Sequence, residues 1–184
     1  MKKTKNILLF GWNFIKHPIQ NASIIPSSIT AAKAMLDNID FSTIKTVVEL
    51  GPGNGVFTNE ILKKSSKNTT IILIEIEKTY VDLLNKKFSG KVIVEHGSAY
   101  CLNTILKKYN IDRPDLIISG LPFSIPGIKK ELLNPIKKHT ENGTIFRFFT
   151  YLPPIMKHIY IDLPVRKVSF VLKNFPPLWI YGIN

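Results

Sequence analysis

From residue 45 onward, short apolar strands alternate with segments of helical periodicity, and this alternation limits the fold more than any other feature. Parallel strands need a long crossover between them, usually a helix, so the pattern predicts an α/β domain with a mostly parallel sheet and helices on both faces. The predicted strands are Thr46–Leu50, Thr70–Ile74, Lys91–Val94, Asp115–Ile118 and Thr144–Thr150; the predicted helices are Val56–Lys64, Lys78–Phe88, Ala99–Lys108 and Ile125–Lys138.

The alternation stops after these five units. Val165–Leu172 and Leu178–Ile183 both have the composition of strands, and no helical segment separates them. We therefore expect an antiparallel hairpin at the C-terminal end of a parallel sheet. Before the sheet, Ile29–Leu36 has helical periodicity and follows Ser28, a residue type that caps helices. Pro126 and Pro135 indicate a broken or shifted helix in that part of the chain.

A glycine-rich turn follows the first predicted strand. Gly51, Gly53 and Gly55 come directly after that strand and before a helix, and such a turn lets a ligand approach the backbone closely. Glu75 ends the second strand, where a carboxylate can accept both hydroxyls of a ribose. The hydride-transfer fingerprint G-x-G-x-x-G requires a glycine three residues after Gly53, and Val56 stands at that position, so the spacing does not fit this fingerprint. The order of strand, turn, helix and acid still predicts a nucleotide-type ligand. The alternative is a turn that serves only tight packing.

The net charge of +12 is unevenly distributed. Residues 1–36 carry five lysines and no acid, residues 37–128 carry eleven basic and ten acidic groups, and residues 129–184 carry nine basic and three acidic groups. Two basic ends around a nearly neutral middle indicate an anionic partner, either nucleic acid or an acidic membrane surface. Cys101 is the single cysteine, which excludes an internal disulfide framework and a cysteine-based zinc finger, and no metal site is expected.

The N-terminal segment combines lysines with apolar side chains at helical spacing. We predict an amphipathic helix in residues 1–20, followed by one domain over residues 21–184. Such a helix can lie in a membrane interface, or it can pack on its own domain. The candidate membrane-binding residues are Lys2, Lys3, Lys5, Phe10, Trp12, Phe14 and Lys16. No apolar run is long enough to span a bilayer, and a secretory signal peptide is not expected.

The stretch from Val48 to Gly55 resembles motif I of the class I methyltransferases that use S-adenosylmethionine. The resemblance implies a Rossmann-like, seven-stranded sheet with an antiparallel last strand, and S-adenosylhomocysteine as the product. It also implies that the turn of Gly51, Gly53 and Gly55 packs beside the methionine part of the cofactor. Glu49 would reach the same end of the cofactor directly or through water, and Glu75 would hold the ribose.

Two further stretches extend the resemblance. Ser98 stands where many relatives have an aspartate that binds the adenine amino group, and its neighbours at the expected cofactor site are Ile76, Ala99 and Ser119. The loop after the fourth strand is similar to the Asn-Leu-Pro-Tyr/Phe loop of the rRNA adenine dimethylases, with Gly120 in the place of the asparagine. Glycine has no side chain that can accept from an adenine amine.

Further stretches match along almost the whole chain: the basic amphipathic start, Ile25–Ser28, Glu49–Gly55, Glu75–Glu77, Ser119–Pro122, and the tail Arg147–Pro154 with Arg166–Pro177. With these stretches, the chain resembles the bacterial phospholipid N-methyltransferases. The resemblance implies S-adenosylmethionine-dependent methylation of phosphatidylethanolamine toward phosphatidylcholine by a cytoplasmic enzyme, peripheral on the inner face of the membrane, with an anionic surface as partner. The amine would be held by backbone carbonyls around Gly120, Leu121 and Pro122, and Phe123 or Tyr151 would face its growing positive charge. The four histidines are expected to be surface or packing residues, and Cys101 to be buried.

Three alternatives remain at this stage. An RNA adenine methyltransferase would use the basic ends to bind phosphates; Gly120 and the chain's end at Asn184 disfavour it, and nucleic acid is not the expected partner. A non-catalytic membrane or cofactor-binding module would not need the complete set of motif residues. A small-molecule methyltransferase would leave the basic amphipathic start without a role.

Overall fold

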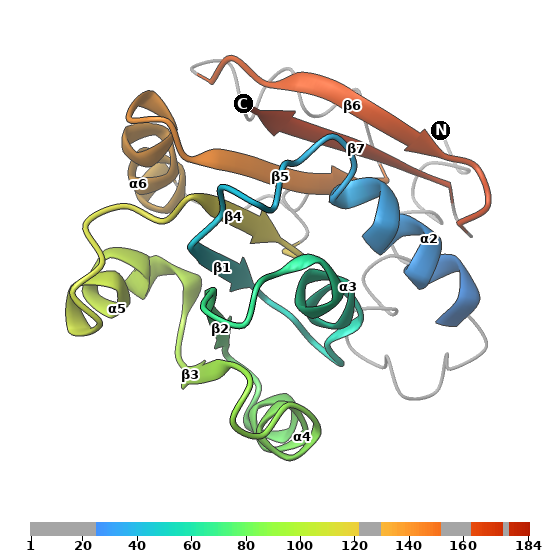
Figure 1. Ribbon diagram of the computed structural model, residues 1–184. Helices are drawn as coiled ribbons and strands as arrows, with labels where there is room; N and C mark the ends of the chain where they lie inside the picture. The colour runs from blue at the N-terminus through green and yellow to red at the C-terminus, as the bar shows by residue number, and fades with distance from the viewer. Residues whose placement is uncertain (1–24, 122–129, 152–162, 175–176) are drawn as a thin grey trace.

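A single mixed sheet organises the part of the chain that the computed structural model describes, which is residues 25–121, 130–151, 163–174 and 177–184. Its seven strands lie in the order β3-β2-β1-β4-β5-β7-β6 (Figure 1). The strands are β1 Thr46–Leu50, β2 Thr70–Glu75, β3 Ile93–His96, β4 Leu116–Ser119, β5 Ile145–Thr150, β6 Arg166–Val171 and β7 Leu178–Ile183. The helices are α2 Ile25–Met35, α3 Val56–Lys64, α4 Lys78–Lys87, the short 3₁₀ helix η2 Ala99–Cys101, α5 Leu102–Lys108 and α6 Lys130–Glu141.

The predicted fold class is confirmed. Strands β1 to β5 pair in parallel, whereas β7 is antiparallel to both β5 and β6. The two C-terminal strands therefore form the expected hairpin, with β7 inserted between β5 and the edge strand β6. Because β6 and β5 are both antiparallel to β7, β6 runs in the same direction as β5.

Helices cover both faces of the sheet. Met35 of α2, Ile61 of α3 and Leu84 of α4 belong to the core on one face. Ile105 of α5 and Ile136 of α6 belong to the core on the other face. The central strands are almost continuously buried, as expected for parallel strands covered on both sides.

Several element boundaries differ from the predictions. Strand β3 begins at Ile93 rather than at residue 91, and the expected helix from Ala99 to Lys108 starts with the separate 3₁₀ turn η2. Helix α2 begins at Ile25, so Ser28 lies inside the helix and the prediction that it caps the helix is wrong. Helix α6 continues through Pro135 to Glu141. Proline removes one backbone hydrogen bond from the helix, but the burial of the apolar face of α6, which includes Leu132 and Ile136, offsets this loss.

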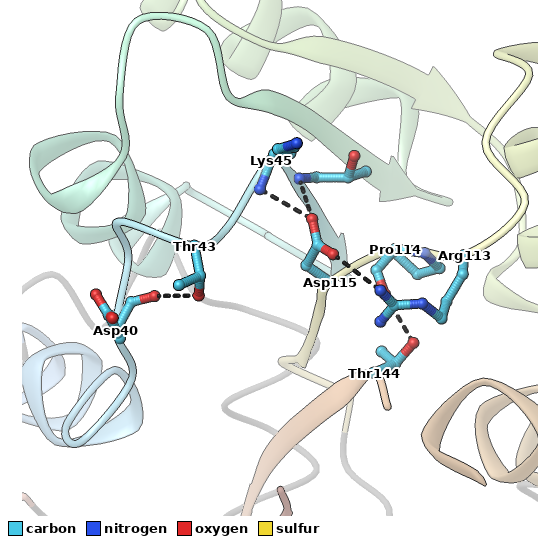
Figure 2. A network of polar contacts seen from close by, with 8 residues as sticks. Asp40, Thr43, Lys45, Arg113, Pro114, Asp115 and Thr144 are labelled. Carbon is cyan, nitrogen blue, oxygen red and sulfur yellow. Dashed lines mark hydrogen bonds and ion pairs between the residues drawn. The ribbon is translucent and has the colours of Figure 1, made fainter. Parts of the chain in front are cut away.

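The starting edge of the sheet is held by Asp115, which directly precedes β4. Its Oδ2 accepts hydrogen bonds of 2.9 Å from the backbone N–H groups of Lys45 and Thr46, and Oδ1 accepts one of 3.3 Å from Arg113 (Figure 2). Thr144 Oγ1 donates to the Pro114 carbonyl at 2.7 Å, which joins the start of β5 to the same network. These contacts align the first residues of β1, β4 and β5, so the last residues of the same strands also lie close together.

Arg147 of β5 is a charged side chain inside the core and is 1% exposed. Its Nη1 donates to the carbonyls of Phe146 and Ile183 at 3.3 Å each. A Cβ atom on Gly182 would lie 2.5 Å from Nη1, so the glycine in β7 leaves the space that the guanidinium occupies. Burial lowers the pKa of Arg147.

In the described ranges, no helix is long and apolar enough to cross a membrane. The expected amphipathic helix of residues 1–20 lies outside the described residues, so its predicted conformation stays a prediction.

Candidate functional site

The residues singled out in the sequence meet at one edge of the sheet, where the parallel strands end. Backbone hydrogen bonds join the segments that leave neighbouring strands: Gly51 N–H donates to Ile74 O at 2.9 Å, and Gly120 N–H donates to Leu50 O at 2.8 Å. Gly97 N–H donates to Glu75 O at 2.9 Å and brings the end of β3 to the same edge. The parallel order therefore assembles one site from segments that lie far apart in the chain.

The glycine turn is shaped for a ligand on one side and for packing on the other. Gly53 has φ of +54°, a conformation that side chains other than glycine rarely adopt, and nothing lies within 4 Å of the position of its missing Cβ atom. At Gly55 a Cβ atom would lie 2.5 Å from the ring of Phe88 on the other side of the turn. A ligand can thus approach the backbone at Gly53, whereas Gly55 serves helix packing.

Glu75 is preoriented by backbone hydrogen bonds. Its carboxylate is 5% exposed; Oε2 accepts from Gly53 N–H and Oε1 from Glu77 N–H, at 3.0 Å each. Each carboxylate oxygen has a second lone pair, so both can still accept a hydroxyl. The bond to Gly53 also joins the end of β2 to the glycine turn, which sequence reasoning did not anticipate.

Glu49 is fully buried in β1. Its Oε2 accepts a 2.6 Å hydrogen bond from Thr58 Oγ1, while Oε1 has no hydrogen-bond partner among the described residues. Burial raises the pKa of Glu49 to about 7, against the opposing hydrogen bond from Thr58. An acid held in this way has one oxygen available for a donor that arrives from outside, and a cationic donor favours its ionised form.

Lys87 is a further residue at this site that the sequence did not single out. From the end of α4 its Nζ donates to the Asn54 carbonyl in the glycine turn at 2.9 Å. Partial burial lowers the pKa of Lys87, and the charge of Glu49 acts in the opposite direction. The sequence signal was only a lysine in the last turn of a helix, which is common and normally means a solvated side chain.

Ser98 has a local role in the structure. Its Oγ accepts from Tyr100 N–H at 3.3 Å and caps the 3₁₀ helix η2. Ile76, which follows Glu75, is 63% exposed, and its carbonyl lies 3.1 Å from Nε2 of His96. An exposed isoleucine near Ser98 and Ala99 is consistent with a ligand that covers it, and the adenine contact of these residues stays a prediction.

The loop after β4 is packed directly on the glycine turn. Ser119 is buried, and its Oγ accepts from Leu121 N–H at 3.2 Å. A Cβ atom on Gly120 would lie 2.5 Å from the carbonyl oxygen of Gly51, a distance that real Cβ atoms essentially never show. Leu121 in turn covers Gly51 from the other direction. The glycine at position 120 is therefore required by close backbone packing.

Tyr151 follows the last residue of β5 and lies at the same edge of the sheet. Its side chain is hydrogen-bonded to that of Asn174, which is 4% exposed in the turn after β6, and burial raises the pKa of Tyr151. The Tyr151 ring also makes an edge contact with Phe149, with ring centroids 5.6 Å apart. The sequence does not predict the link between Asn174 and Tyr151, because the two residues lie 23 positions apart in the chain.

Some predicted residues are placed differently or not described. Cys101 is exposed, so the prediction that it is buried is wrong; the turn η2 directs this residue away from the core residues Leu102 and Ile105. Pro122, Phe123 and the candidate membrane residues Lys2, Lys3, Lys5, Phe10, Trp12, Phe14 and Lys16 lie outside the described residues. In the part of the chain that the structure describes, no group of three or more His, Cys, Asp or Glu residues is arranged to hold a metal ion.

The strand order, the glycine turn and the two buried acids define a class I methyltransferase, and solved structures with this fold agree. A putative RNA methyltransferase of Pyrococcus horikoshii superposes with a TM-score of 0.57 over 85% of this chain and 80% of that one, at 20% identity. The fibrillarin of Aeropyrum pernix, solved with natively bound S-adenosyl-L-methionine, has a TM-score of 0.61 over 82% of this chain and 73% of that one, at 10% identity.

A sequence profile described as ribosomal RNA adenine dimethylase matches residues 14–150, so the chain belongs to this family of methyltransferases that use S-adenosylmethionine. The ornithine lipid N-methyltransferase of Singulisphaera acidiphila is 30% identical over 184 residues, which cover 96% of this chain and 95% of the relative. The ribosomal RNA small subunit methyltransferase A of Mycoplasma mycoides is 27% identical over 63% of this chain and only 39% of the relative.

The residues present fit the cofactor. Gly53 leaves open space beside the backbone, Glu75 has free lone pairs, and Glu49 has an unpartnered buried oxygen at the same edge. S-adenosylmethionine carries ribose hydroxyls and a cationic amino group, which are the donors that two carboxylates can accept. When bound, it supplies an electrophilic methyl group on a sulfonium.

Proposed function

We propose that this methyltransferase methylates the primary amine of a lipid headgroup at a membrane surface, with phosphatidylethanolamine as the substrate expected from the sequence. The observation that carries the proposal is the end-to-end match with an ornithine lipid N-methyltransferase, which covers 95% of that relative. The match with an rRNA methyltransferase covers 39% of its length. Ornithine lipid and phosphatidylethanolamine both present a primary amine, so the amine is the shared chemistry.

The loop at Gly120 supports an amine rather than an adenine as the acceptor. The corresponding loop of the rRNA adenine dimethylases has an asparagine, whose side chain accepts from the adenine amine. Here the backbone of Gly120 packs so closely on Gly51 that a side chain has no room. Backbone carbonyls around Gly120, Leu121 and Pro122 are then the acceptors that we assign to the substrate amine.

The chemistry requires a neutral nitrogen in line with the methyl group. A lipid ammonium resembles lysine, with a pKa of about 10.4, so it must lose a proton before attack. Burial raises the pKa of Tyr151 above its ordinary value, so we assign this residue to hold the substrate and not to remove a proton. Its aromatic ring favours the positive charge that grows on the nitrogen. Positioning of the amine supplies much of the rate acceleration.

Membrane docking is the second part of the proposal. A lipid amine stays at the bilayer surface, so the enzyme must bind there. We assign this role to residues 1–20, where four lysines accompany Phe10, Trp12 and Phe14. Each lysine near an anionic leaflet contributes on the order of 1 kcal/mol, which allows reversible binding.

The test is a comparison of acceptors with methyl-labelled S-adenosylmethionine. The protein is incubated in parallel with vesicles that contain phosphatidylethanolamine, with vesicles that contain ornithine lipid, and with ribosomal RNA. We expect label in a lipid fraction and none in the RNA. Label in ornithine lipid alone would correct the headgroup and keep the lipid proposal.

The second candidate is methylation of an RNA adenine. The family profile over residues 14–150 and the basic ends of the chain favour it. Label in the RNA with none in either lipid would establish this candidate and contradict the lipid proposal.

A further inference from the structure

The C-terminal hairpin exposes large apolar side chains. Leu172, in the turn after β6, is 71% exposed, the largest value for a bulky hydrophobic residue in the described ranges. Phe170 is 42% exposed and packs against Trp179 on the neighbouring strand, with ring centroids 4.7 Å apart. Exposed apolar side chains that cluster in this way are typical of an interaction surface.

The turn of this hairpin lies at the edge of the sheet that carries the site. Strand β6 runs parallel to β5, so the turn that follows Val171 projects from the same edge as the segments that follow β1, β4 and β5 (Figure 1). The hydrogen bond between Asn174 and Tyr151 joins the turn to the end of β5. A surface that docks on the turn is therefore brought close to the site.

The hairpin is basic as well as apolar. Arg166, Lys167 and Lys173 are exposed, and the sequence has no acidic residue from Leu163 to Asn184. Lys173 directly follows Leu172, so a cation and an exposed leucine occur together in the turn. This combination is complementary to a surface that is anionic outside and apolar beneath, which describes a bilayer with acidic lipids.

Two other occupants fit less well. A second copy of the chain could add a strand to the edge strand β6, but the irregularity between Lys167 and Ser169 and the charges beside it disfavour regular pairing. RNA would be contacted by cations and by flat rings, whereas the most exposed side chain, Leu172, can neither bind a phosphate nor stack on a base.

We propose that the described end of the β6–β7 hairpin is a second membrane anchor, in which Leu172 and the Phe170–Trp179 pair enter the interface of an anionic bilayer beside Lys173. The inference rests on the proposed lipid function and adds a site to it. With the hairpin turn on the membrane, the sheet edge with Tyr151 lies close to the headgroups.

The experiment measures sedimentation of the full chain with vesicles of phosphatidylcholine and phosphatidylglycerol. Leu172→Gln should partition roughly fivefold more weakly, because a leucine in the interface contributes part of its burial free energy. The double variant Leu172→Gln, Lys173→Glu should lose roughly twentyfold or more. Leu83→Gln is the matched control, since Leu83 is a 45% exposed leucine on α4, at the opposite end of the sheet.

The outcomes separate this inference from the proposed function. If the wild type binds and methylates lipid while both hairpin variants bind as tightly as Leu83→Gln, the second anchor is wrong and the lipid function stands. If the wild type does not bind acidic vesicles, both the anchor and the docking part of the proposed function are wrong.

Two further readouts test whether the chain itself or RNA covers this surface instead. If Leu172→Gln lowers the melting temperature without weakening vesicle binding, the patch is covered by the chain itself and the anchor is contradicted. If it weakens binding of a ribosomal RNA fragment and not of vesicles, the surface contacts RNA and the anchor is again contradicted. Unchanged melting temperature and cofactor affinity with weaker vesicle binding support the proposal.

Discussion

Glu49 is the acid whose pKa is shifted most in the described site, and this shift leads to a prediction about the stability of the protein. Burial raises its pKa from 4.5 to about 7, so the folded protein without cofactor holds a proton that the unfolded chain releases. Between these two pH values the folded state binds more protons than the unfolded state, and stability therefore falls as pH rises.

The variant Glu49→Gln should remove this pH dependence. Each pKa unit corresponds to about 1.36 kcal/mol, so without cofactor the variant should be more stable than the wild type by about 3 kcal/mol at pH 8 and by almost nothing near pH 4.5. Denaturant unfolding at several pH values measures the difference. A stability difference that stays constant with pH would contradict the raised pKa.

The second prediction at the scale of a residue concerns Glu75. Glu75→Ala removes the acceptor that we assign to the cofactor hydroxyls, together with the acceptor of two backbone N–H groups, so cofactor affinity should fall by about 1.5–3 kcal/mol, roughly tenfold to a hundredfold. Isothermal titration with S-adenosylhomocysteine measures this loss. Glu77→Ala is the control, because Glu77 is an exposed carboxylate two positions away. Equal affinities of the two variants would remove Glu75 from the site.

At the scale of elements, the site depends on two turns that touch. The loop after β4 and the glycine turn after β1 pack backbone to backbone at Gly120 and Gly51, and Leu121 covers the contact. The sequence of neither turn predicts this contact between the two backbones, because a glycine after a strand is compatible with many loops.

Gly120→Ala should therefore destabilise the protein. The added Cβ atom meets a backbone oxygen at 2.5 Å, and backbone cannot move away as a flexible side chain can. We expect a loss of about 1–3 kcal/mol in unfolding free energy together with weaker cofactor binding, measured by denaturant unfolding and titration.

Gly97→Ala is the matched control for this prediction. Gly97 lies at the same edge of the sheet, and nothing is within 4 Å of the position of its missing Cβ atom. If Gly120→Ala is as stable as Gly97→Ala, the close contact with Gly51 does not constrain the loop.

At the scale of the whole molecule, the excess positive charge and the predicted cofactor residues lie in different parts of the sequence. The acids and glycines of the site belong to the nearly neutral middle of the chain, and the excess of lysine and arginine lies toward the two ends. A charge arranged in this way can hold the protein on an anionic surface through the two ends of the chain.

Charge reversal at Lys2, Lys3 and Lys5 should weaken partitioning to acidic vesicles by about 1 kcal/mol for each lysine and should leave cofactor affinity unchanged. Sedimentation at low and high salt measures the effect, which should shrink as salt screens the charges. The control is reversal at three exposed lysines whose segments lead into β2, β4 and β5 at the starting edge of the sheet: Lys67, Lys107 and Lys138. Equal losses in the two triple variants would show that only net charge matters.

The fold class was accessible from the sequence. The alternation of strands and helices, the strand Thr46–Leu50 and the helix Val56–Lys64 follow from hydrophobic periodicity, which is a local property. Motif and spacing also act over short distances, so they allow Gly53 and Glu75 to be assigned to the cofactor as a prediction. The exposed position of Cys101 and the start of α2 were missed, since each depends on what the rest of the chain covers.

The amino-acid sequence by itself determined the order of the elements, the positions of the glycine turn and the acids, and the distribution of charge. Only the tertiary structure decided that Gly120 must be glycine, that Glu49 keeps an unpartnered oxygen and a raised pKa, and that Asn174 joins the hairpin turn to Tyr151. These properties arise from contacts and burial between segments far apart in the chain, where long-range packing sets the distances and excludes water.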